Sequence, residues 1–431
     1  MRLHAIDSKR LRRISKESAW VAFGQLAAVL GALVGVRLLT ELLDPASYGE
    51  LALGMTLATL IHQCIFGPLG NGIVRFWSPA QEANDLSGYL SVVRNMLVRA
   101  TGLVIALVVL LLGVLSYSGR GAWAVMAVLA SIFALLRGYN SILGGMQNAA
   151  RQRIVFAFHQ GTEAWLRFLL AAAVIVWLGS ISTAAMGGYV LAIIVILTSQ
   201  ALFFRRIAPV IKDPAPSELW REQIWQFSWP FAAFGLFTWA QVASARWSLE
   251  VFADTKDVGL YAVLFQLGVY PMSIFTAMVI QYLAPIFYER AGDAQDTVRN
   301  ENVSVLGARL TTIALSLTIV ATVCMLVLHK PIFRLFVAEE YRSVSYLLPW
   351  LVFAGGLIAA AQTVELNLMS MLKTHSMLYA KVMTAVAGVI FNYLGARYYG
   401  TSGVVVANVL FAVPYFSWML YLKNRDIGGN G

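Results

Sequence analysis

Between Arg99 and Arg120 the chain reads ATGLVIALVVLLLGVLSYSG, which is 20 residues (100–119) without a charged side chain. A helix rises about 1.5 Å per residue, so this stretch is long enough to cross about 30 Å of hydrocarbon. Its apolar residues are continuous rather than alternating, which favours a helix over a strand of a membrane barrel. The stretch therefore predicts a transmembrane helix.

Similar stretches recur along all 431 residues of the chain. Hydrophobic residues make up 59% of the chain and charged residues 13%, whereas a soluble domain carries about 25% charged residues. We therefore predict an all-α polytopic membrane protein with joins too short to hold a soluble catalytic domain. The 12 predicted spans are 18–40, 50–70, 89–116, 121–146, 154–178, 183–204, 226–250, 259–284, 303–328, 344–370, 374–398 and 402–422.

The lysines and arginines of the loops predict the orientation. With the N-terminus inside, 18 of them lie in inner segments and 5 in outer segments, which is the bias of an inside-positive topology. Both termini are therefore expected in the cytoplasm. The same bias accounts for much of the net charge of +10, so no nucleic-acid partner is predicted.

A weak internal repeat suggests two halves. Residues 43–52, LDPASYGELA, align with residues 253–262, ADTKDVGLYA, at an offset of 210, and the Asp, the Gly and the last Ala match. Six predicted spans separate the copies, so this predicts two six-helix lobes related by an axis along the membrane normal. The predicted segments are a basic cytoplasmic tail 1–17, an N-terminal lobe 18–207, a cytoplasmic linker 208–222, a C-terminal lobe 223–422 and a cytoplasmic tail 423–431.

Charged side chains persist inside the predicted spans, where each costs about 2.5–3.5 kcal/mol. By helical rise, Arg99 lies about 15 Å and Arg167 about 20 Å from the inner end of its span. Arg137 is nearer the interface, where an arginine can snorkel. Arg75 follows span two and either lines the inner mouth or anchors the inner side. Because guanidinium groups bind phosphates with two parallel hydrogen bonds, we predict that these arginines contact a pyrophosphate.

The fifth span also carries candidates for ion coupling. His159, Glu163 and Arg167 are four residues apart and share one helical face. Glu163 and Arg167 could simply neutralise each other, or a proton or sodium ion at Glu163 could release Arg167 to meet an anion. Glu365, in the inner part of span ten, is the second carboxylate candidate. Arg309 and Lys381 lie near the inner face and are expected to snorkel.

The sequence lacks several motifs of enzymes and ATP-driven machines. It has no Gly-x-x-x-x-Gly-Lys-Ser/Thr loop, no His/Cys/Asp cluster with metal-ligand spacing and no Gly-x-Ser-x-Gly elbow. Cys64 and Cys324 both lie in apolar segments and give no disulfide framework. We therefore expect no cofactor, no metal site and no enzymatic activity.

Four short motifs are similar to those of a known family. They are SAW at 18–20, LLDPASYG at 42–49, NGIVRF at 71–76 and VGLY at 258–261. Together they resemble bacterial polysaccharide flippases of the Wzx type, the O-antigen and exopolysaccharide members of the multidrug/oligosaccharidyl-lipid/polysaccharide exporter superfamily. The resemblance extends over the whole chain by length, span number and midpoint repeat.

This resemblance implies a V-shaped, MATE-like bundle in the bacterial inner membrane. It would flip undecaprenyl-pyrophosphate-linked oligosaccharides to the outer leaflet by ion-coupled alternating access, as an antiporter. The expected partners are this lipid-linked substrate, membrane lipid, and the polymerase and chain-length proteins of O-antigen, exopolysaccharide or lipopolysaccharide synthesis. Two alternatives stay open: a cation-coupled multidrug exporter of the same superfamily, and a membrane-embedded polysaccharide polymerase or glycosyltransferase.

Overall fold

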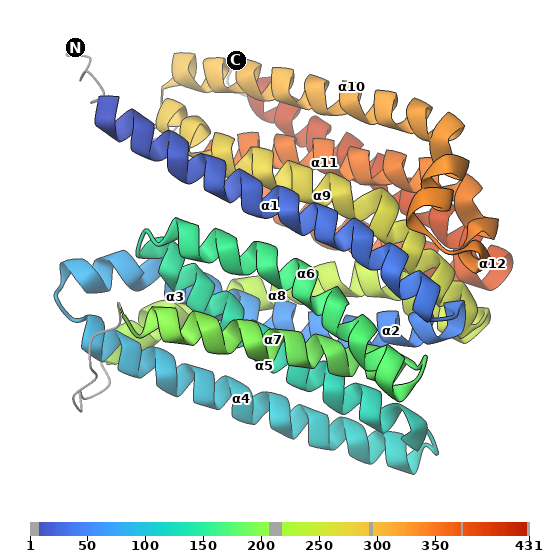
Figure 1. Ribbon diagram of the computed structural model, residues 1–431. Helices are drawn as coiled ribbons and strands as arrows, with labels where there is room; N and C mark the ends of the chain where they lie inside the picture. The colour runs from blue at the N-terminus through green and yellow to red at the C-terminus, as the bar shows by residue number, and fades with distance from the viewer. Residues whose placement is uncertain (1–7, 207–217, 293–295, 372–373, 429–431) are drawn as a thin grey trace. The chain divides into compact units, whose positions relative to one another are not determined.

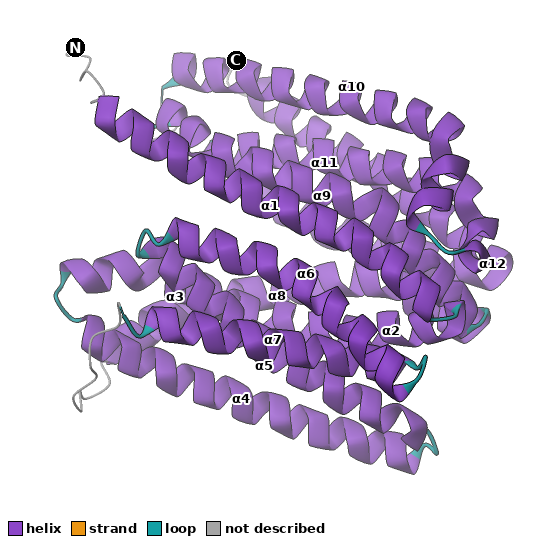
Figure 2. Ribbon diagram, viewed as in Figure 1, coloured by secondary structure: helices purple, strands orange, loops and turns teal. Residues whose placement is uncertain are grey.

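The computed structural model describes residues 8–206, 218–292, 296–371 and 374–428. Within these residues the chain is helical, with short connections and no strand (Figure 2). Each predicted segment includes residues outside this description: 1–7 of the first tail, 207 of the N-terminal lobe, 208–217 of the linker, 293–295 and 372–373 of the C-terminal lobe, and 429–431 of the last tail. The prediction of an all-α chain is confirmed.

Long helices follow one another along the chain (Figure 1). The first group extends from α1 to α7. Within it, the single π-helical turn η1 joins α2 to α3. These elements are α1 (Ser8–Leu42), α2 (Pro45–Ile61), η1 (His62–Phe66), α3 (Gly67–Glu82), α4 (Leu86–Tyr117), η2 (Gly121–Trp123), α5 (Ala124–Ala149), α6 (Arg153–Leu178) and α7 (Ser182–Phe204). The second group is α8 (Glu218–Phe252), α9 (Thr255–Ala291), α10 (Thr297–Phe336), η3 (Glu339–Leu347), α11 (Leu348–Ser370) and α12 (Thr374–Gly428).

Ten helices among the described residues are long and apolar enough to cross a membrane. Two differences separate this number from the 12 predicted spans. Glutamines, serines and tryptophans dilute the apolar residues of α8, which is helical over the predicted seventh span but is not among the ten. The last two predicted spans lie in α12, whose helical geometry is broken at Gly400 with φ 56° and ψ −137°. The chain is a multi-pass membrane protein.

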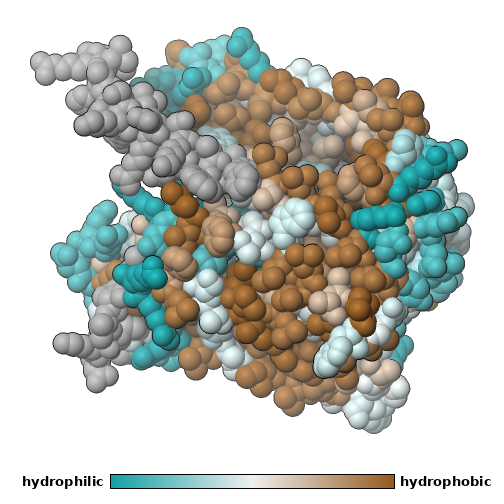
Figure 3. All heavy atoms as spheres, in the orientation of Figure 1, coloured by the Kyte–Doolittle hydropathy of each residue, from teal (hydrophilic) through white to brown (hydrophobic). Residues whose placement is uncertain are grey.

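The surface fits a lipid environment. Val109 and Leu110 of α4 are 63% and 65% exposed, which a soluble helix would avoid at successive apolar positions. On the face drawn in Figure 3, hydrophobic side chains cover the middle of the helices and hydrophilic ones gather near their ends. This is the distribution that a helix needs in order to cross hydrocarbon and end in water.

The described chain divides into two compact units. Unit 1 comprises Met1–Leu42 and Gly54–Trp239, and unit 2 comprises Leu43–Leu53 and Ala240–Gly431. Helices α2 and α8 therefore each contribute one part to unit 1 and the other part to unit 2.

The two copies of the predicted repeat meet inside unit 2. A side chain at Gly49 would collide with the carbonyl oxygen of Thr255, and one at Gly259 with that of Pro45. The contact is reciprocal, so each glycine lets the backbone of the other copy approach. The preceding aspartates also act alike, since Asp44 accepts a hydrogen bond from the Ser47 amide at 2.8 Å and Asp254 one from the Asp257 amide at 2.8 Å. The two copies are therefore similar in structure as well as in sequence.

In unit 1, α6 is held firmly against α1. The Phe168 ring occupies the space that a side chain at Gly35 would need, and Trp165 Nε1 donates to the carbonyl oxygen of Ala27 at 2.9 Å. Small residues let membrane helices approach closely, which replaces the hydrophobic driving force that lipid does not supply. This packing sets the position of the charged residues that α6 carries.

Candidate functional site

The carboxylate of Glu163 points from α6 to α5. Its Oε1 lies 4.0 Å from Arg137 Nε, and its Oε2 accepts a hydrogen bond from Asn140 Nδ2 at 3.2 Å. The side chains of Arg137 and Glu163 are 40% and 18% exposed. The ion pair is therefore loose, partly solvated and formed between helices, and Glu163 pairs with Arg137 rather than with Arg167, the partner that one of the two sequence-based interpretations gave it.

Arg167 instead lies against aromatic rings. Its guanidinium carbon is 4.8 Å from the ring centroid of Phe168 and 5.3 Å from that of Tyr189 on α7. Its Nε is buried without a hydrogen-bond partner, and it forms no ion pair with any residue that the structure describes. Cation–π contact lowers the cost of the charge but leaves the hydrogen-bonding edge of the guanidinium unused.

One aromatic cluster connects the two arginines. Phe133, Phe168 and Tyr189 come from α5, α6 and α7, and Tyr189 lies 5.9 Å from each of the other two rings. The guanidinium carbon of Arg137 is 5.8 Å from the Phe133 centroid. We call this cluster, with Arg137, Asn140, Glu163 and Arg167, the arginine site. Two cations face one carboxylate, so the site carries surplus positive charge suited to an anion.

Two other predicted residues lie elsewhere in unit 1. Arg99 on α4 and Arg75 on α3 are exposed, and the only contact that the described structure gives Arg75 is with the ring of Phe76, at 5.9 Å from its centroid. Neither residue contacts the arginine site among the described residues. The structure thus brings together two of the four predicted phosphate-binding arginines.

His159 is a buried, fully engaged side chain with 3% exposure. Its Nδ1 lies 2.8 Å from the carbonyl oxygen of Val155, and its Nε2 lies 3.0 Å from Ser199 Oγ on α7. A carbonyl oxygen can only accept, so Nδ1 is the donor and Nε2 accepts from the serine. These hydrogen bonds join α6 to α7. Both ring nitrogens of His159 have a partner, so neither is free to bind a coupling ion as predicted.

Sequence reasoning missed His62, which opens the π-helical turn η1. Its Nδ1 is buried without a hydrogen-bond partner. The Phe66 ring at the end of the turn occupies the space beside Gly138 of α5. Single π-turns inside helices are frequent at functional sites. The Gly67-Pro68 pair that follows was the available signal, because it marks an irregular helix.

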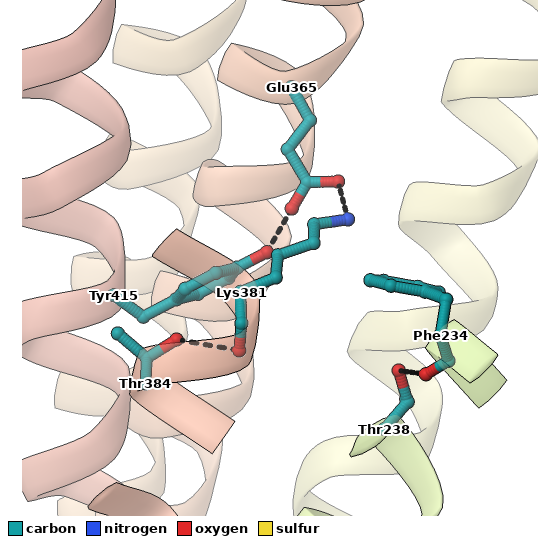
Figure 4. Close-up of polar contacts among 6 residues, drawn as sticks. All are labelled: Phe234, Thr238, Glu365, Lys381, Thr384 and Tyr415. Carbon is teal, nitrogen blue, oxygen red and sulfur yellow. Dashed lines mark hydrogen bonds and ion pairs between the residues drawn. The ribbon is translucent and has the colours of Figure 1, made fainter. Parts of the chain in front are cut away.

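Unit 2 holds a different charged cluster (Figure 4). Lys381 Nζ donates to Glu365 Oε2 at 2.5 Å, and the Tyr415 hydroxyl donates to Glu365 Oε1. The Glu365 side chain is 10% exposed and that of Lys381 22%. The prediction that Lys381 snorkels to the surface is therefore wrong, because the ammonium turns inward to α11. We call these three residues the carboxylate triad.

The carboxylate triad is electrically balanced. One carboxylate faces one ammonium, and both oxygens of Glu365 have donors. Buried apolar residues surround it, including Ala361, Val364 and Phe411. A buried ion pair needs such complete partnering to offset the loss of hydration. Glu365, the second predicted coupling carboxylate, is thus already matched by a cation of the chain itself.

No protein-family model matches the chain, and no curated protein matches it by sequence. Solved structures do match. An inward-facing MATE family multidrug resistance transporter of the MOP superfamily aligns with a TM-score of 0.70 at 15% identity, over 94% of this chain and 98% of its own. The lipid II flippase MurJ, in an inward closed conformation, aligns with a TM-score of 0.72 at 11% identity, over 94% and 86%.

The chain has the fold of these membrane proteins. An outward-facing MATE family transporter also aligns, with a TM-score of 0.61 at 15% identity over 96% of this chain and 97% of its own. These neighbours are transporters or flippases rather than enzymes. The predicted MATE-like fold is therefore confirmed.

Proposed function

We propose that this protein is a MOP-superfamily flippase that moves undecaprenyl-pyrophosphate-linked oligosaccharide units from the inner to the outer leaflet of the bacterial inner membrane. The shared fold supports membrane transport, and the MurJ neighbour is itself a lipid II flippase. The polysaccharide would be an O-antigen or an exopolysaccharide. Both termini would lie in the cytoplasm, and a polymerase and chain-length proteins would act on the product.

The observation that carries this proposal is Arg167. A guanidinium inside a membrane helix costs free energy, and here it has no ion pair with any described residue. Its neighbour Arg137 makes a loose 4.0 Å ion pair with Glu163 and lies over the Phe133 ring. Each phosphate of a pyrophosphate has oxygens that can accept two parallel hydrogen bonds from a planar guanidinium, and a substrate that supplies them would repay the cost of placing two cations there.

Glu163 gives this site a means of coupling. Its carboxylate competes with an incoming phosphate for Arg137, because both are anions that bind the same guanidinium. A proton or sodium ion arriving at Glu163 would weaken its hold on Arg137 and favour the substrate. Alternating access would then move the charged headgroup while the lipid tail stays in the bilayer.

The second candidate function is a cation-coupled multidrug exporter, which the MATE family neighbours favour equally by fold. A cationic cargo would be repelled by two arginines that face one carboxylate, so the arginine site favours the flippase. Arg167→Ala distinguishes the two functions in the cells that produce the protein. The flippase predicts loss of surface polysaccharide with unchanged drug sensitivity, and the reverse pattern would favour the exporter.

Two controls make this experiment specific. Arg397→Ala removes an exposed arginine of α12 whose guanidinium lies over Tyr398, and we expect normal surface polysaccharide. Immunoblotting of membranes would establish that both variants are inserted in equal amounts. Purified protein that elongated or transferred glycans in detergent would contradict transport and favour the polymerase or glycosyltransferase alternative.

A further inference from the structure

A cavity opens between the end of α9 and the beginning of α10 in unit 2. Its volume is about 810 Å³. Three arginines from the two helices line it, Arg290 on α9 and Arg299 and Arg309 on α10. Asn302 lies between the two arginines of α10 and adds a further hydrogen-bonding group. The cavity is thus a polar pocket built by two helices, distinct from the arginine site of unit 1.

Positive charge prevails in this pocket. Arg299 pairs with Asp296, whose Oδ2 lies 3.6 Å from its Nε. Arg290 and Arg309 form no ion pair with any residue that the structure describes. Glu289 is the one carboxylate among the lining residues that the structure describes. Two guanidinium groups are therefore available to an anion, and a phosphate is the group that matches their planar geometry.

The uncharged stretches of α9 and α10 indicate where the pocket lies relative to the membrane. Residues 310–328 of α10 carry no charged side chain, and their 19 residues span about 28 Å, the thickness of the hydrocarbon. Arg309 stands at the border of this stretch, and Arg299 lies about 15 Å farther out. On α9, residues 258–288 are also uncharged, and Glu289 and Arg290 follow them directly. The pocket thus lies at the level of lipid headgroups.

Apolar side chains complete the pocket. Ile286 of α9 is 41% exposed and Val305 of α10 is 47% exposed, and Leu306 lies beside them in the lining. A hydrated ion gains nothing from these apolar side chains. The glycerol and the upper acyl chains of a phospholipid, in contrast, can pack against them. Snorkelling to the interface would explain why the charged residues here are arginines, but it would not explain why arginines of two helices line the same cavity.

We propose that the α9–α10 pocket binds the phosphate of an anionic phospholipid, with Arg290 and Arg309 as its main ligands. The acyl chains lie along Ile286 and Val305. This site is independent of the substrate proposed for the arginine site, because no residue is shared between them.

Native mass spectrometry of the purified full-length protein tests this proposal. The probes are phosphatidylglycerol and phosphatidylcholine with identical acyl chains, titrated in detergent. The wild type should retain phosphatidylglycerol preferentially, and Arg290→Gln with Arg309→Gln should weaken its binding about 30-fold, or about fivefold for each charge removed near a lipid surface. Arg94→Gln, which removes an exposed arginine of α4 in unit 1, should leave binding unchanged.

Two further arms separate the possible outcomes. Arg290→Lys with Arg309→Lys keeps both charges and should retain most of the preference for phosphatidylglycerol, which shows that loss in the glutamine variant is not loss of folding. Inorganic phosphate at the same concentration should not displace the lipid. The proposal is overturned if the glutamine variant binds phosphatidylglycerol like the wild type, if phosphatidylcholine binds equally well, or if inorganic phosphate alone occupies the site.

Discussion

Glu163 in unit 1 and Glu365 in unit 2 are both carboxylates on membrane helices, yet their surroundings differ in kind. Glu163 shares a loose 4.0 Å contact with Arg137, and a second arginine of the same site has no carboxylate. Glu365 lies 2.5 Å from Lys381 and also accepts from Tyr415. The first arrangement can exchange partners at little cost, and the second cannot.

This difference assigns separate tasks to the two clusters. Partly solvated ion pairs contribute about 0–1 kcal/mol to stability, so the arginine site can give up its internal contact when a ligand arrives. A buried pair that loses one partner leaves an uncompensated charge, which costs about 3–5 kcal/mol. We therefore expect substitutions in unit 1 to affect transport, and those in the carboxylate triad to affect folding.

The largest effect is expected in the carboxylate triad. Lys381→Met leaves the Glu365 carboxylate without its cation, and we expect the free energy of unfolding to fall by about 3–5 kcal/mol. Thermal unfolding in detergent measures this loss. The double variant Glu365→Gln with Lys381→Met removes both charges and should recover most of it. If the single and double variants were equally unstable, the pairing would not be the source of the stability.

Arg167→Ala should give the next largest effect, on transport rather than on folding. Hydrogen bonds to a charged group contribute about 1.5–3 kcal/mol, so the initial flipping rate in proteoliposomes should fall about 10- to 100-fold. The unfolding temperature should change little, because Arg167 has no ion pair to lose among the described residues. Arg167→Lys should recover part of the rate, since lysine keeps the charge without the planar fork. Full activity of Arg167→Ala would remove Arg167 from the substrate site.

Glu163→Gln should act in the opposite direction on binding. The amide no longer competes for Arg137, although it can still pair with Asn140. We expect undecaprenyl pyrophosphate to bind about fivefold more tightly, which corresponds to about 1 kcal/mol for a partly exposed ion pair. Transport should lose its dependence on the coupling ion. Weaker binding in this variant would show that Glu163 assists the substrate rather than competing with it.

His159→Gln should give the smallest effect. The side chain joins α6 to α7 through Ser199, so its replacement costs about 1 kcal/mol of unfolding free energy. Transport in proteoliposomes should stay within about twofold of the wild type, because the arginine site is unchanged. A large loss of transport without loss of stability would return His159 to the coupling mechanism.

Much of the architecture follows from local sequence properties. Apolar length alone predicts the helices, and the shared Asp and Gly of residues 43–52 and 253–262 predicts two similar turns. What the alignment did not reveal is that Gly49 and Gly259 pack against each other's turn. A contact between residues 210 positions apart depends on tertiary packing, which no local pattern encodes.

The sites were harder to predict than the fold for the same reason. Helical spacing placed Glu163 beside Arg167, but in the folded chain its carboxylate meets Arg137 on α5. Depth along the helix suggested that Lys381 snorkels, but its partner Glu365 lies on another helix. Spacing along one helix fixes which residues share a face, and only packing decides which neighbouring helix that face meets.

The binding of undecaprenyl pyrophosphate to the purified protein distinguishes the arginine site from the carboxylate triad. The comparison is between Arg137→Gln with Arg167→Gln in unit 1 and Glu365→Gln with Lys381→Met in unit 2, each a double substitution measured in nanodiscs against the wild type. We expect about 100-fold weaker binding for the first variant, from about 3 kcal/mol lost, and binding within about twofold of the wild type for the second. Equal loss in both variants, or loss only in unit 2, would show that the arginine site does not bind the pyrophosphate.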